Sequence, residues 1–235
     1  MIRNICKMYT LYHHPADPFS RKVRLMLAEK GLEFTLSEEE PWEIRPDFLA
    51  KNPGKAIPVL EEPDGHILCG HRPICEYIDE ITSRPLFGAY ARDKAEVRRL
   101  CDWFDEKFHK EVTVYLAGEK ISKRLNGGTP DSDAIRAGKI NILGHMNYTE
   151  WLLKQRNWLA GEAFTMADFA AAAQFSVLDY IGEVPWEKKA DDGSLIFEET
   201  KNWYSRIKSR PSFRNLLTDR IPGVLPAPHY GNLDF

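Results

Sequence analysis

Four cysteines, Cys6, Cys69, Cys75 and Cys101, are the most readily oxidised side chains of the 235-residue sequence. None belongs to a Cys-x-x-Cys pair, and no histidine stands at the spacing of a zinc finger. Cysteines without such partners behave as small buried hydrophobic residues in a reducing compartment. They therefore predict no metal site and no disulfide catalyst.

Polar side chains gather around the first strong helix signal. Asp17 precedes Pro18, the pattern of an N-cap acceptor followed by proline at the first helical position. Tyr12, the pair His13-His14 and Ser20 stand close by and carry hydrogen-bond donors. Each of these can equally serve packing, and the N-cap role explains Asp17 fully.

The elements that position these side chains read as an α/β unit. Asp64-Gly65 is a hairpin signal between two β-rich runs. The predicted order is β-α-β-α-β-β-α. We expect strands at residues 8–12, 34–36, 57–60 and 66–69, and helices at 17–30, 46–50 and 73–81.

Helices alone are expected from residue 92 onward. Apolar residues recur every three or four positions from Val97 to Tyr115 and from Ile135 to Leu153. Thr165 and Asp168 form a capping box, with Asp in the place of Glu, at the start of an alanine-rich buried helix. The predicted divisions are an α/β domain at 8–82, a linker at 83–91, an all-α domain at 92–219 and an extended tail at 220–235.

Composition limits the classes of function. The formal net charge is −3, so the chain lacks the basic balance of a nucleic-acid-binding protein. Residues 1–7 lack the apolar region of a signal peptide, and no stretch approaches the roughly 18 apolar residues of a membrane span. We expect a cytoplasmic protein without membrane insertion, whose start is Met1 or Met8.

Four segments in register resemble glutathione transferases. They read LYHHPADPFSRKVRLMLAEKGL, NPGKAIPVLEEPDGHIL, WLAGEAFTMADFAAAA and SRPSFR, and they run in the expected order up to Arg214. The resemblance implies a glutathione transferase fold, with a thioredoxin-like domain followed by an all-helical domain. It also implies a cis peptide before Pro58, where the backbone of Ile57 would pair with the cysteinyl unit of glutathione.

The first departure from that family lies at the start of the first helix. The resemblance implies a serine, tyrosine or cysteine there, in contact with the glutathione sulfur, but this sequence has Asp17. An ionised carboxylate only accepts hydrogen bonds, and it would raise the pKa of a nearby thiol by repelling the thiolate. Ser20 is the fallback donor, and the sequence assigns no catalytic residue.

The second departure lies before the third helix. Gly70 and His71 stand where the family implies an acidic residue and a serine that hold the γ-glutamyl group. Glycine offers the ammonium no partner, whereas His71 and Arg72 could still attract an anion. Lys55 could reach a glycyl carboxylate. The candidate glutathione-like pocket is therefore Lys55, Ile57, Pro58, His71 and Arg72.

Two other segments offer aromatic residues to a partner. Trp42 lies in an acidic loop, and Phe48 belongs to the same segment; Trp42 either packs on the domain interface or anchors a partner. Residues 221–235 lack periodicity, so the tail either folds back onto the helical domain or binds a partner. The candidate partner-binding residues are Trp42, Phe48, Tyr230, Leu233, Asp234 and Phe235.

A narrower resemblance accounts for these departures. The words HHPxDPxSR, PWExRPxFLxxNP, EVPW and HYxxLDF are similar to those of FtsZ-binding, glutathione-transferase-like division proteins of alphaproteobacteria. This implies a non-enzymatic dimer that binds FtsZ filaments and requires no cofactor. The stripe from Val97 to Tyr115 is long for one helix to bury within one domain, and it suggests where the dimer packs. The alternative is an active glutathione transferase that conjugates or reduces small electrophiles.

Overall fold

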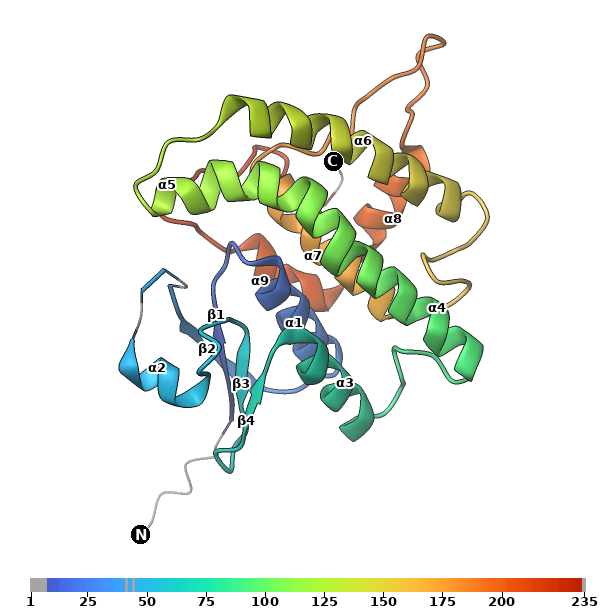
Figure 1. Ribbon diagram of the computed structural model, residues 1–235. Helices are drawn as coiled ribbons and strands as arrows, with labels where there is room; N and C mark the ends of the chain where they lie inside the picture. The colour runs from blue at the N-terminus through green and yellow to red at the C-terminus, as the bar shows by residue number, and fades with distance from the viewer. Residues whose placement is uncertain (1–7, 41, 44, 234–235) are drawn as a thin grey trace.

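The computed structural model describes residues 8–40, 42–43 and 45–233. A four-stranded sheet with its helices forms one half, and a group of longer helices forms the other (Figure 1). Among the described residues, no helix combines the length and the apolar character needed to cross a membrane. The predicted succession of a thioredoxin-like half and an all-helical half is confirmed.

The sheet has the strand order β2-β1-β3-β4. The strands are β1 (Tyr9–His13), β2 (Phe34–Glu38), β3 (Val59–Glu61) and β4 (Ile67–Cys69). β1 runs parallel to β2 and antiparallel to β3, which pairs antiparallel with β4. The predicted turn joins β3 to β4, and Gly65 adopts there a φ of +94°, which favours glycine.

Three helices complete this half: α1 (Pro18–Glu29), α2 (Pro46–Lys51) and α3 (His71–Ile81). α1 begins where the sequence predicts, because Asp17 accepts a hydrogen bond from the Ser20 N–H at 2.6 Å. Val23, Leu25, Met26 and Leu27 are fully buried, and α1 packs against α3 of its own half and against α7 (Met166–Tyr180) of the other. α1 is therefore the element shared by the two halves.

A long helical rod opens the second half (Figure 1). It consists of α4 (Ala91–Asp102), η1 (Trp103–Ser122), which is wound as a π-helix, and α5 (Lys123–Leu125). The stripe that begins at Val97 is buried up to Val112, while Tyr115 is 37% exposed. Because most of the stripe packs inside its own chain, the expectation that it needs a second copy for burial is wrong.

The remaining helical elements are α6 (Ser132–Leu153), α7 (Met166–Tyr180), α8 (Glu198–Lys208), the short 3₁₀ turn η2 (Pro211–Phe213) and α9 (Arg214–Leu217). Every residue of α7 is buried, and this helix packs against α1, α4, η1 and α8. The predicted capping box at the start of α7 is present. Asp168 accepts bonds from the Thr165 N–H at 2.8 Å, the Leu159 N–H at 3.0 Å and the Trp203 indole at 2.9 Å.

Replacing Asp168 by alanine is expected to lower the free energy of unfolding by about 3–5 kcal/mol, because several buried donors lose their acceptor together. Denaturant titration measures the loss. Asp133→Ala is the matched control, since that carboxylate is exposed in the first turn of α6 and should change stability by less than about 0.5 kcal/mol. Equal stability of the two variants would contradict this account of α7.

Candidate functional site

The loop before β3 has the backbone geometry that the family resemblance implies. The Ile57–Pro58 peptide is cis, as expected. The Pro58 carbonyl accepts a bond from the Gly70 N–H at 3.0 Å, which ties this loop to the start of α3. Lys55 lies exposed in the same loop with a φ of +58°. The backbone of the glutathione-like pocket is thus retained.

Asp17 lines a cavity of about 360 Å³ between the loop that follows β1 and the far end of the helical rod. Burial raises the pKa of Asp17 to about 6, so the carboxylate is largely ionised at neutral pH. The walls of the cavity are formed by His14, Ala16, Asp17, Pro18, Trp42, His109, Thr113, Val114, Ala117, Gly118, Ser122 and Asn126. The residue expected at the sulfur position therefore does face a cavity.

Among the described residues, Tyr12, His13 and Ser20 do not line the cavity beside Asp17. Ser20 is fully buried, and its hydroxyl lies 3.4 Å from the His14 N–H, which donates to it. Tyr12 donates to the Glu61 carboxylate at 2.8 Å. His13 is buried. These side chains serve the structure around the β1–α1 loop, so the fallback role of Ser20 finds no support in this geometry.

His71 and Arg72 do not form an anion site, which corrects the sequence prediction. The His71 ring stacks on Phe19 with centroids 4.3 Å apart. Burial and the neighbouring Lys22 lower the pKa of His71 to about 3, so the ring is neutral. Arg72 pairs with Asp102 and Glu106, each at 3.1 Å. Neither side chain offers a free positive charge to a γ-glutamyl carboxylate.

The two aromatic residues of the acidic segment have different environments. Phe48 is only 7% exposed and packs on Tyr12 with centroids 6.0 Å apart, so its assignment to a partner surface is wrong. Trp42 is half-buried and packs edge-to-face on His14 at 5.3 Å. It forms a wall of the cavity that Asp17 lines. Trp42 is therefore the accessible aromatic of this segment.

The tail folds back onto its own chain, which overturns the assignment of Tyr230 to a partner. Tyr230 is 1% exposed, and its hydroxyl accepts from Arg21 at 3.0 Å and donates to the Leu216 carbonyl at 2.9 Å. Its ring meets Tyr180 edge-to-face. Leu233 is 37% exposed. Asp234 and Phe235, the other two tail candidates, lie outside the described residues.

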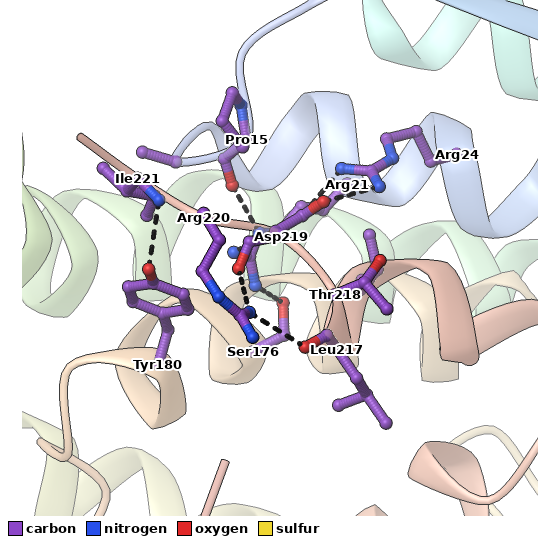
Figure 2. Close-up of polar contacts among 12 residues, drawn as sticks. Pro15, Arg21, Arg24, Ser176, Tyr180, Leu217, Thr218, Asp219, Arg220 and Ile221 are labelled. Atoms are coloured by element: carbon purple, nitrogen blue, oxygen red, sulfur yellow. Dashed lines mark hydrogen bonds and ion pairs between the residues drawn. The ribbon is translucent and has the colours of Figure 1, made fainter. Parts of the chain in front are cut away.

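Arg21 and Asp219 organise this junction, and sequence analysis missed both. The fully buried Arg21 donates to the Pro15 carbonyl at 2.6 Å and to the Ser176 hydroxyl at 3.0 Å. Asp219 accepts two bonds from Arg24, both at 2.8 Å (Figure 2). Arg21 belongs to a mostly basic run, Arg21 to Arg24, and such a run on a helix usually faces solvent. The one signal in the sequence was that this run lies within a helix whose other residues are suited to the core.

Replacing Tyr230 by phenylalanine removes a hydroxyl that bonds to both a buried charge and a buried carbonyl. We expect a loss of about 1–3 kcal/mol, seen as a melting temperature lowered by roughly 3–8 °C. Tyr115→Phe is the control, because that tyrosine is partly exposed and should melt with the wild type. An unchanged melting temperature for Tyr230→Phe would show that the tail is not held by this contact.

Comparisons with known proteins agree with this architecture. The family model described as "Glutathione S-transferase, N-terminal domain" matches residues 18–81, and "Glutathione S-transferase, C-terminal domain" matches residues 144–211. FtsZ-localized protein A of Caulobacter vibrioides is 46% identical, over 96% of this chain and 98% of that protein. Glutathione S-transferase 2 of Saccharomyces cerevisiae is 29% identical, over 89% and 90% of the two chains.

Solved structures show the same likeness. A glutathione S-transferase from Rhodospirillum rubrum has a TM-score of 0.91 and 47% identity, and covers 97% of this chain and 100% of its own. FzlA from C. crescentus has a TM-score of 0.90 and 46% identity, with the same coverage. The similarity therefore extends through both halves of the chain.

Proposed function

The chain belongs to the glutathione S-transferase family, and we propose that it acts as a non-enzymatic, dimeric regulator of cell division that binds FtsZ filaments. The similarity to FtsZ-localized protein A, which spans nearly the whole of both chains, supports this assignment. On the same basis we propose that the protein works in the cytoplasm at the division site and requires no cofactor.

The observation that carries the non-enzymatic half of the proposal is the charge of the cavity. A transferase stabilises the glutathione thiolate with a hydrogen-bond donor. Here Asp17 lies at the corresponding helix start, and it is the only formally charged side chain among the described residues that line the cavity. A carboxylate repels a thiolate instead of stabilising it.

The other half of a glutathione site is altered as well. Gly70 has no side chain with which to bind an ammonium group. The His71 ring is neutral and stacked on Phe19, while Arg72 is held by two acidic residues. Two chemically separate contacts to the γ-glutamyl group are thus weakened in one chain.

The alternative, an active glutathione transferase, is favoured by the similarity to proteins named glutathione S-transferase and by one feature of the backbone. The cis Ile57–Pro58 peptide preserves the backbone that would pair with the cysteinyl unit. Backbone pairing can hold a thiol near the cavity, but it does not supply the donor that lowers the pKa of the thiol. Binding without turnover is compatible with this geometry.

Co-sedimentation with polymerised FtsZ tests the proposed function directly. The chain should pellet only when FtsZ is polymerised, and light scattering should give about twice the 27.1 kDa of one chain. Trp42→Ala should weaken pelleting by roughly tenfold or more, as expected of an aromatic anchor. Tyr90→Ala, which removes an exposed aromatic from the linker, should pellet normally. Absence of wild-type pelleting would overturn the filament assignment.

Replacing Asp17 by serine should leave glutathione turnover at background, because the weakened contacts at Gly70 and His71 remain. Serine is a comparable N-cap, so the melting temperature should change little. An aromatic-substrate assay, with calorimetry of glutathione binding, measures both proteins. A large gain in turnover from this single change would show that the rest of the glutathione site is intact and that the non-enzymatic proposal is too strong.

A further inference from the structure

We propose that the cavity beside Asp17 is a cation site that holds the guanidinium or ammonium group of a basic side chain presented by the filament partner. The source of that side chain rests on the proposed function, whereas the preference for a cation rests on the cavity alone. A volume of about 360 Å³ lies at the lower end of the range for small-ligand sites.

The negative charge of Asp17 is not neutralised within the cavity. No lysine or arginine is among the described residues that line it, and no ion pair of Asp17 occurs among the described residues. The nearby guanidinium of Arg21 is turned to the Pro15 carbonyl, Ser176 and Tyr230 in the core. A cation that enters the cavity therefore meets a carboxylate that is hydrogen-bonded to the start of α1 but forms no ion pair among the described residues.

His109 adds a second acceptor. Its Nδ1 lies 3.4 Å from the side-chain oxygen of Gln174, which also accepts the Thr113 hydroxyl at 2.7 Å. Because that amide oxygen can only accept, Nδ1 carries the ring proton, and Nε2 is left with a lone pair. Burial lowers the pKa of His109, so the ring stays neutral and keeps this acceptor. A neutral ring and a free acceptor both suit a guanidinium or ammonium group, which carries only N–H donors.

Trp42 gives the cavity an aromatic wall. A tryptophan face attracts guanidinium and ammonium groups through its ring quadrupole. The ring is fixed by its edge-to-face contact with His14, whose Nδ1 accepts the Ala16 N–H at 3.1 Å. Burial lowers the pKa of His14, so this neighbour adds no positive charge that would repel a cation. The Asp17 carboxylate, the His109 lone pair and the Trp42 ring, all on residues that line the cavity, thus favour the same kind of ligand.

Two further acidic residues lie near the cavity wall that Trp42 forms. Glu40 and Glu43 flank Trp42 in sequence and are exposed, and Glu40 lies close enough to His14 to influence its titration. Within the described residues, neither glutamate forms an ion pair. Negative charge around a narrow site raises the local concentration of basic partner segments and speeds their association. Charge complementarity therefore selects a lysine or arginine side chain of the docked protein over an anionic thiol compound.

The test uses n-butylguanidinium as a probe for the basic side chain, with n-butyrate as the anionic control of matched size. Calorimetry or tryptophan fluorescence of the full chain should show binding of the first and not of the second. Asp17→Asn keeps the N-cap but removes the charge, and should weaken probe binding by about tenfold or more. Asp133→Asn, an exposed carboxylate on α6, should bind the probe like the wild type.

Competition identifies where the cation comes from. If the inference holds, n-butylguanidinium lowers the amount of chain that pellets with FtsZ filaments, and Asp17→Asn pellets less. Filament binding that is indifferent to both the probe and Asp17→Asn overturns the partner assignment while leaving the proposed function intact. Absence of probe binding, or equal binding by Asp17→Asn, overturns the cation site itself. Probe binding without any filament binding refutes the proposed function and the partner, and retains only the cation preference.

Discussion

The buried guanidinium of Arg21 is the interaction on which the arrangement of the molecule depends. A charge without access to solvent is costly unless its donors are satisfied. Arg21 finds its acceptors on three separate parts of the chain: the Pro15 carbonyl before α1, Ser176 in the core helix α7, and Tyr230 in the tail. If any one of these parts moved away, a buried N–H donor of the guanidinium would lose its acceptor. The loop that carries Asp17 is thereby fixed against the helical half.

The fold keeps the frame of its family while the chemistry of the cavity is reversed. The cis Ile57–Pro58 loop and the capped start of α1 are both retained. What differs from the pattern that the family resemblance implies is a small set of side chains: a carboxylate at Asp17 in place of a donor, and a neutral ring at His71 in place of a γ-glutamyl contact. Function resides in such sites and not in the fold that carries them. If the proposed function holds, a few substitutions have converted a catalytic cavity into a docking site.

Features that depend on neighbouring residues could be predicted from the sequence. The Asp17 cap, the glycine turn before β4 and the Asp168 capping box each need only a few adjacent residues, and all are present. The resemblance to a family supplied the domain order and the cis peptide. The burial of Phe48 and Tyr230 could not be predicted, because their contacts join residues far apart in the chain. The same holds for the stack of Phe19 on His71.

The distance along the chain between Arg21 and Tyr230 has a consequence for synthesis. Domains generally fold as units while the chain is being made, the first one before the rest. Here the first helix lacks one acceptor for its buried charge until the tail, 209 residues later, has been added. The α/β half therefore cannot reach its final state on the ribosome ahead of the helical half. The packing of the first helix is therefore completed only after the last residues of the chain have been synthesised.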